Sequence, residues 1–176
     1  MSFPATPPGR PPPAAAGRGF VLGPDEGEAY HWLGSLTLTK VRAADTDGGL
    51  DLVDHRVPAG YAPPRHVHRE SDEVFYLLDG TLEVTCGEDS WHVGPGSVVF
   101  LPKGVPHSFV ADSDRPARTL LLNAPAGFGE LVVELGTATG GRELPGEDVP
   151  VPDQERVASV SARYGIEPAA PPQDAR

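Results

Sequence analysis

Residues 60–80 read GYAPPRHVHRESDEVFYLLDG, and the fold prediction rests on this stretch. His66 and His68 are two residues apart, so on a β-strand both side chains point to the same face. Glu73 begins the next apolar run. Two neutral imidazoles and a carboxylate from an adjacent strand form a three-ligand set that suits a transition ion. The stretch therefore predicts a metal site carried by β-strands.

A fourth ligand is predicted from residues 96–111, GSVVFLPKGVPHSFVA. His107 follows the rigid turn 102–106, which contains two prolines and can direct the ring back across a barrel. Three nitrogens and one carboxylate oxygen suit one divalent ion of Mn, Fe, Co, Ni, Cu or Zn, and the type of ligand does not select among these metals.

Composition favours short strands over a helix bundle. The chain has 176 residues, of which 21 are glycine and 21 are proline. Apolar runs between turn signals predict strands over 36–39, 50–57, 73–78, 81–86, 90–93, 97–101, 107–110 and 118–122. Asp79-Gly80 predicts a two-residue hairpin between the third and fourth of these runs. The pattern is typical of a small antiparallel barrel or jelly roll, and therefore of an all-β fold.

The ends of the chain have a different character. Apolar residues at helical spacing predict two short helices over 126–135 and 153–164, packed outside the barrel. The predicted organisation is a flexible Pro/Ala/Gly-rich leader (1–19), a barrel (20–125), helices joined by an acidic Gly/Pro linker (126–165) and a loose tail (166–176).

Charge and cysteine content limit the partners and the compartment. A net charge of −11 argues against nucleic acid and against anionic membrane surfaces. No run approaches the roughly 20 apolar residues of a membrane span. Cys86 is the only cysteine, which excludes an intrachain disulfide, and we expect a cytoplasmic protein.

Two motifs resemble those of the cupin superfamily. Gly60-x5-His66-x-His68-x4-Glu73-x6-Gly80 matches the first motif at each specified position, and Gly96-x5-Pro102-x-Gly104-x2-His107 matches the second until Ala111, where the family has Asn. The resemblance implies a double-stranded β-helix, the cupin or jelly-roll barrel. It also implies that His66, His68, Glu73 and His107 surround one ion.

A narrower resemblance concerns activity. HVHRESDEVFYLLDG (66–80), FLPKGVPHSF (100–109) and NAPAGFGELVVELG (123–136) are similar to small bacterial single-domain cupins grouped with quercetin 2,3-dioxygenases, which open a flavonol ring with dioxygen. The resemblance implies a metal-dependent dioxygenase, an oxidoreductase, with a small phenolic or flavonol-type substrate. In that group the glutamate matching Glu73 is both a ligand and the proposed base for the substrate hydroxyl.

Two functional classes other than a dioxygenase remain as alternatives. The same site would serve a metal-dependent isomerase, cyclase or decarboxylase that consumes no oxygen, or a non-catalytic protein that binds a small molecule. We expect Phe75, Leu77, Phe100 and Phe109 to line a substrate pocket, although residues inside a small barrel are apolar in any case.

The remaining histidines and the sheet edges give two further expectations. His31, His55 and His92 lie outside both motifs and are expected on the surface or in hydrogen bonds. Exposed strand edges favour pairing with a second copy, so we expect a homodimer with residues 30–41 as the interface strand.

Overall fold

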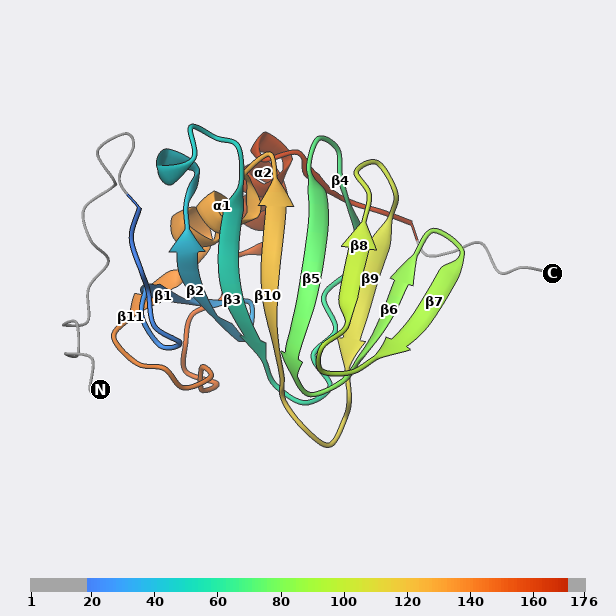
Figure 1. Cartoon of the computed structure of the whole chain (residues 1–176), viewed down its shortest axis with the longest axis horizontal. Helices are drawn as coiled ribbons and strands as arrows, with labels where there is room; N and C mark the ends of the chain where they lie inside the picture. Colours follow the sequence, from blue (N-terminus) through green and yellow to red (C-terminus); the bar gives the residue numbers. More distant parts are fainter. Residues whose placement is uncertain (1–18, 171–176) are drawn as a thin grey trace.

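Two antiparallel sheets face each other in the computed structural model, which describes residues 19–170 (Figure 1). Within those residues, the larger sheet has seven strands in the order β11-β1-β2-β3-β10-β5-β8, and the smaller has five in the order β12-β4-β9-β6-β7. The strands of the larger sheet are β1 (Glu28–Trp32), β2 (Ser35–Val41), β3 (Asp51–Val57), β5 (Asp72–Asp79), β8 (Val98–Leu101), β10 (Ala117–Ala124) and β11 (Thr137–Thr139). Those of the smaller are β4 (His66–His68), β6 (Leu82–Cys86), β7 (Asp89–Val93), β9 (His107–Ala111) and β12 (Ile166–Pro168). The all-β jelly-roll prediction is confirmed.

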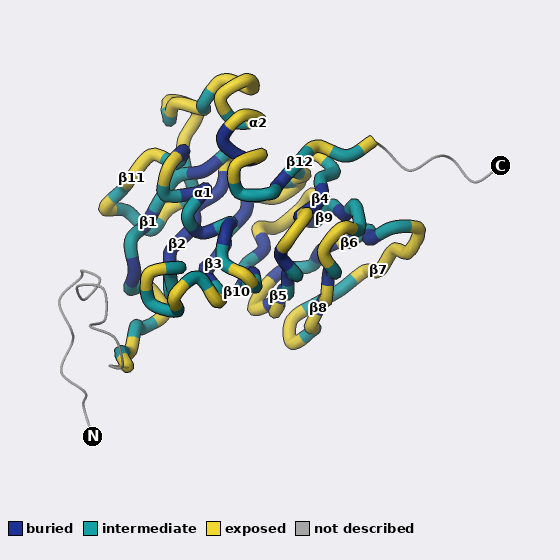
Figure 2. Tube along the Cα trace, turned by 90° about the horizontal axis from the view of Figure 1, so that it is seen from above, coloured by how far each residue is buried: buried dark blue, intermediate teal, exposed yellow. Residues whose placement is uncertain are grey.

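The core lies between the sheets because the strands alternate. In β10, every second residue from Ala117 to Asn123 is buried, and the residues between them are half-buried. Phe75, Leu82, Val84 and Leu121 come from both sheets and pack in the same core cluster. The tube coloured by burial shows buried residues, in dark blue, along β2, β3 and β10 (Figure 2).

The predicted hairpin at Asp79-Gly80 is wrong. β5 belongs to the seven-stranded sheet and β6 to the five-stranded sheet, so this turn carries the chain from one sheet to the other. Gly80 has a φ of +78°, and an added Cβ would lie 2.5 Å from the carbonyl oxygen of Pro116, so only glycine fits there. The dipeptide determines the turn, but it does not determine which strands pair on either side.

The C-terminal segment adds a strand to each sheet. β12 pairs with β4, so the predicted loose tail is wrong for residues 166–168. The rest of the tail from residue 171, and residues 1–18 of the predicted leader, lie outside the described residues. β11 pairs with β1, and residues 35–39 of β2 are buried, so the segment 30–41 is not a free sheet edge. The predicted homodimer interface at residues 30–41 therefore cannot form by strand pairing, because this segment has no free edge.

The two predicted helices are present and pack beside the barrel. α1 (Phe128–Leu135) begins where the carboxylate of Asp51 accepts the backbone N–H groups of Gly127 and Gly129, at 2.6 and 3.0 Å. α2 (Gln154–Arg163) is capped by Asp153, which accepts the N–H of Arg156 at 2.8 Å. Their apolar faces pack with one residue of each sheet, Trp32 of β1 and Ile166 of β12, in a second cluster that also contains Leu131, Val132, Leu135 and Val160. Among residues 19–170, no helix is long and apolar enough to cross a membrane.

Candidate metal centre

Three histidines and one glutamate converge between the two sheets. His66 and His68 lie on β4, His107 begins the neighbouring strand β9, and Glu73 lies on β5 of the opposing sheet. One ligand atom from each of the four residues lies within 4.8 Å of the others. The sequence placed Glu73 on a strand adjacent to the histidines, whereas the structure places it across the barrel. The four residues predicted as ligands are therefore brought together, with ligands contributed by both sheets.

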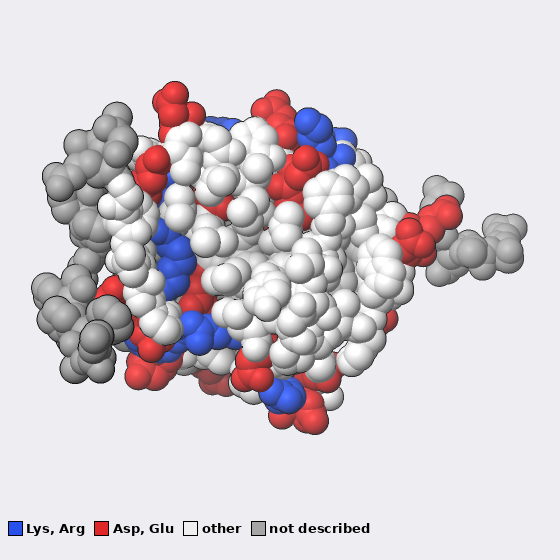
Figure 3. Space-filling view, viewed as in Figure 1, with Lys and Arg blue, Asp and Glu red and all other residues white. Residues whose placement is uncertain are grey.

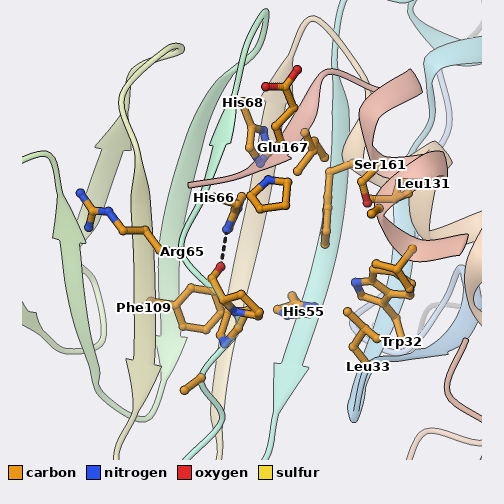
Figure 4. A pocket seen from close by; sticks show the side chains of 18 of the residues that line it. Trp32, Leu33, His55, Arg65, His66, His68, Phe109, Leu131, Ser161 and Glu167 are labelled. Carbon is orange, nitrogen blue, oxygen red and sulfur yellow. Dashed lines mark hydrogen bonds between the residues drawn. The ribbon is translucent and has the colours of Figure 1, made fainter. Parts of the chain in front are cut away.

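Backbone contacts determine which nitrogen of two histidines is free. Nδ1 of His66 lies 3.0 Å from the carbonyl oxygen of Pro64, and Nδ1 of His107 lies 3.0 Å from that of Val105. A carbonyl oxygen only accepts, so each Nδ1 carries the proton and donates it. Each Nε2 then presents a lone pair. The dashed line in Figure 4 marks the contact of His66.

The surroundings of Nε2 of His107 fit a bound cation. Nε2 of His107 is buried with no hydrogen-bond partner among the described residues, and it lies 3.3 Å from Oε2 of Glu73. Two electron-rich atoms so close together in a buried site repel each other unless a positive charge lies between them. The donor set of three imidazoles and one carboxylate could therefore hold a metal ion.

The protonation states also suit metal binding. Burial lowers the pKa of His66 to about 4 and lowers the pKa of His68, so both rings are neutral near pH 7. Burial by itself would raise the pKa of Glu73, but His68, His107 and His66 outweigh it and hold that pKa at about 2. Neutral imidazoles and an ionised carboxylate are the forms in which these side chains bind metals.

Comparison with known proteins identifies the family. A family model described as "Cupin domain" matches residues 53–123, which include all four residues of the centre. The chain carries a cupin domain. The matched range runs from β3 to β10, and β1, β2, β11, β12 and both α-helices lie outside it.

Curated relatives and solved structures resemble part of this chain. Quercetin 2,3-dioxygenase of Bacillus subtilis is 29% identical over 96 residues, which are 54% of this chain and 28% of that protein. The chain spans less than two thirds of the length of the first curated relatives that it matches. Among solved structures, KdgF from a Halomonas species is 18% identical with a TM-score of 0.53, over 61% of this chain and 94% of that one. The cupin domain of Cnp3 from Schizosaccharomyces pombe is 17% identical with a TM-score of 0.51, over 58% of this chain and 70% of that one. These two structures support the fold alone.

The turn before His107 is tied to the cupin barrel at two points. The N–H of Gly104 donates to the carbonyl oxygen of His68 at 2.7 Å, and the N–H of Lys103 donates to Oδ1 of Asp72 at 2.9 Å. Both bonds connect the turn to residues that precede Glu73 in the chain. They therefore hold His107 at a constant position relative to the other ligands.

Asn123 is a polar contact of the centre that sequence reasoning missed. It is fully buried on β10, next to Glu73 on β5 in the strand register, and its side chain contacts His68. Nδ2 of Asn123 donates to Oδ1 of Asp51 at 3.3 Å. The sequence feature that could have identified Asn123 is its place in the alternation of β10, where a buried residue is expected and asparagine is polar.

A cavity of about 680 Å³ opens beside the centre (Figure 4). His66, His68 and Glu73 form part of its wall, and most of the rest is apolar or aromatic. The other ring-bearing residues of the wall are Trp32, His55, Tyr61, Phe75, Phe109 and Phe128, together with prolines. Side chains of α1 and α2 also line it, so the helices beside the barrel form part of the pocket.

Two of the four residues predicted for a substrate pocket lie at this cavity. Phe75 and Phe109 line the cavity. Leu77 is buried in the barrel core and is not part of the wall. The prediction for Phe100 is wrong: this side chain is 58% exposed, because the alternation of β8 turns Val99 and Leu101 inward and Phe100 outward.

The three histidines outside the centre differ in burial and in position relative to the cavity. His92 is exposed, and Nε2 of His31 contacts the carbonyl oxygen of Glu143 at 3.2 Å, as expected for surface or hydrogen-bonded residues. His55 is also hydrogen-bonded, but it is buried in the wall of the cavity. Its place in the pocket was not predicted because His55 belongs to neither motif.

We expect acid to lower the free energy of unfolding of the metal-free protein because the ring of His55 is buried. Burial lowers the pKa of this ring from an ordinary value of 6.5 to about 4. Between these values the unfolded chain binds a proton that the folded chain excludes, so the free energy of unfolding falls as the pH falls, by about 3 kcal/mol at pH 4. Urea unfolding from pH 7 to 4 should therefore show a shallower decline for His55→Phe than for the unsubstituted chain. His92→Phe, an exposed control, should leave the decline unchanged; parallel curves for His55→Phe would contradict the assignment.

Proposed function

We propose that this cupin is a mononuclear metal-dependent dioxygenase that acts on a phenolic, flavonol-type small molecule. The observation that carries the proposal is the aromatic cavity of about 680 Å³ that opens directly onto the ligand set. Such a volume suits an organic molecule of several rings. The similarity to Bacillus subtilis quercetin 2,3-dioxygenase over 54% of the chain supports the reaction class.

His66, His68, His107 and Glu73 are the residues that would hold the metal. A divalent ion bound there supplies Lewis-acid stabilisation of negative charge on a substrate oxygen. Nδ1 of His66 and of His107 donate to backbone carbonyls, which fixes the ring orientation of both ligands. These backbone hydrogen bonds therefore orient the two Nε2 atoms toward an ion before it binds.

Glu73 is proposed as the base that takes the proton from a substrate hydroxyl. Glu73 is 3% exposed and lines the cavity together with His66 and His68, so a ligand that lies against these histidines also meets Glu73. Because the surrounding histidines lower the pKa of Glu73, its carboxylate is a weak base and takes a proton more readily from an acidic hydroxyl than from a weakly acidic one. This favours a phenolic or enolic substrate over an aliphatic alcohol.

The apolar wall supports chemistry that must exclude water. Phe75, Phe109, Leu121 and Phe128 line the cavity, and they offer an aromatic substrate dispersion contacts rather than hydrogen bonds. Exclusion of water strengthens the electrostatic interactions within the site.

Oxygen uptake separates the proposed reaction from its alternatives. A dioxygenase places both oxygen atoms in the product, so the metal-loaded chain should consume one O₂ per flavonol and needs no other reductant. A panel of flavonols and simple phenols in an oxygen electrode, with product masses, measures this. Turnover without oxygen uptake would indicate an isomerase, cyclase or decarboxylase and overturn the proposal. Binding of the panel without turnover would also overturn it, in favour of a binding protein.

We also propose a homodimer formed through strand β8. This strand is an edge of the seven-stranded sheet, and its outward side chains Val98 and Phe100 are 66% and 58% exposed. Tyr76 and Leu78 of the neighbouring strand β5 continue the exposed apolar face. Figure 3 shows a broad area without charged side chains over β5 and β8.

A second copy is the partner that this face favours. Each chain carries a net charge of −11, so two copies approach most easily where neither presents carboxylates. An edge strand with no charged residue and no proline can pair with its own counterpart across a two-fold axis.

Light scattering after size exclusion should give twice the chain mass of 18.5 kDa. Val98→Lys should give the mass of a single chain, and Val151→Lys, at an exposed position outside the strands, should remain dimeric. A single-chain mass for the unsubstituted protein would contradict the dimer.

A further inference from the structure

His55 is a buried polar group in the wall of the cavity that neither the metal centre nor the proposed base uses. It lies on β3, is 3% exposed, and is not a member of the four-residue cluster. Three aromatic rings meet it nearly edge-on: Tyr61 at 6.1 Å, Phe109 at 6.5 Å and Phe128 at 6.0 Å between ring centroids. Figure 4 shows His55 in the wall together with Phe109 and Trp32. The ring is therefore a polar group within an aromatic region of the pocket.

The contact with Thr37 determines which nitrogen of His55 carries the proton. Oγ1 of Thr37 lies 2.9 Å from Nδ1 of His55, and among residues 19–170 the Thr37 side chain has no other hydrogen-bond partner. Thr37 is fully buried, so its hydroxyl hydrogen must be donated within the protein. Nδ1 of His55 is the available acceptor. The proton of the neutral ring is therefore on Nε2.

Nε2 of His55 is left as a donor without an acceptor. No described residue accepts a hydrogen bond from it, while the ring itself lines the cavity. An unpaired donor in an apolar wall is unfavourable, and an acceptor atom on a ligand in the cavity would pair with it. The aromatic rings around His55 favour an aromatic group next to that acceptor.

We propose that His55 is a specificity-determining residue, whose Nε2–H donates a hydrogen bond to a carbonyl or phenolate oxygen on an aromatic ring of the ligand. This contact lies in the aromatic region of Tyr61, Phe109 and Phe128, apart from the oxygen that faces the ligand set. If the protein is the proposed dioxygenase, this contact requires a second oxygen atom on its substrate. The proposal for His55 depends on the dioxygenase function only for the identity of the ligand. Binding at His55 needs no metal.

A matched pair of probes tests this contact in chelator-treated protein that contains all 176 residues of the sequence. The probes are 2-acetylnaphthalene, which carries a carbonyl acceptor, and 2-ethylnaphthalene, which has nearly the same shape without one. Trp32 lines the cavity and Trp91 is exposed, so Trp91→Phe leaves one fluorophore that reports binding. Two substitutions separate the two nitrogens of His55. His55→Asn keeps a polar group near Nδ1 only, whereas His55→Gln places an amide N–H near the position of Nε2.

His55→Asn should weaken binding of the ketone about tenfold and change binding of the hydrocarbon less than about twofold. His55→Gln should restore most of the affinity for the ketone, and the exposed control His92→Asn should leave both affinities unchanged. Equal losses for both probes with His55→Asn would overturn the proposal. Failure of the ketone to bind the unsubstituted chain would do the same.

A second measurement needs no substitution. The ¹⁵N spectrum of the imidazoles in labelled protein should assign the His55 proton to Nε2 and show that this N–H shifts when the ketone is added. A proton on Nδ1, or an Nε2–H signal that ignores the ketone, would contradict the contact. Because these tests use metal-free protein, they can succeed while oxygen uptake fails, which would refute the dioxygenase and leave His55 as a binding residue.

Discussion

His107→Ala is expected to weaken the binding of a divalent transition ion more than a hundredfold. Loss of a residue that only supports a ligand typically costs 10- to 100-fold in metal affinity, and loss of a ligand should exceed that. His107 is the most enclosed of the three histidines, and its Nε2 lies 3.3 Å from Oε2 of Glu73. A competition titration of Co²⁺ against a chromophoric chelator measures the effect.

His31→Ala is the matched control, because His31 is a half-buried histidine outside the four-residue cluster, and its side chain makes one hydrogen bond among residues 19–170, with the carbonyl oxygen of Glu143. It should leave metal affinity unchanged. Thermal unfolding of the metal-free variants identifies any loss of fold, since removal of a buried imidazole leaves a small cavity. Unchanged affinity in a folded His107→Ala protein would mean that the ion is bound elsewhere.

Glu73→Gln is expected to lower turnover by a factor of about 10² to 10⁴, the usual contribution of a general base. Glutamine has nearly the shape of glutamate but no negative charge, and its amide cannot accept the substrate proton. Since the carboxylate is held ionised by the surrounding histidines, its replacement should also weaken metal binding. Turnover is therefore measured at saturating metal, with the metal content of each sample determined.

Glu70→Gln provides the control for Glu73→Gln, because Glu70 is an exposed carboxylate three residues away. It should retain the full rate. If metal-saturated Glu73→Gln turned over substrate like the unsubstituted chain, the base would have to be another group, although Glu73 could still be a ligand.

The sequence was sufficient to predict the ligand set because local geometry determines most of it. Two residues apart on a strand, His66 and His68 must share a face, and the proline turn before His107 leaves little freedom. Asn123 and His55 were not predicted as site residues because each becomes functional only through neighbours distant in the chain. His55 belongs to the pocket wall through its contacts with the rings of Tyr61, Phe109 and Phe128. Asn123 belongs to the centre through its contact with His68.

Strand pairing was the less predictable part of the fold. Asp79-Gly80 has the composition of a hairpin turn, yet the strands on either side find partners in different sheets because each sheet needs its apolar face covered. Residues 166–168 contain a proline and a glutamate, and they form a strand because they pair with β4 while Ile166 packs in the second cluster. Both outcomes depend on long-range packing rather than on local propensity.

X-ray absorption of the zinc-loaded chain tests the central claim most directly. We predict one ion per chain with three imidazole nitrogens and one carboxylate oxygen in its coordination shell, at about 2.0–2.2 Å. The imidazole signal should diminish in His107→Ala. A zinc shell without imidazole scattering, or a spectrum that is identical in His107→Ala, would contradict the claim that these four side chains form the metal centre.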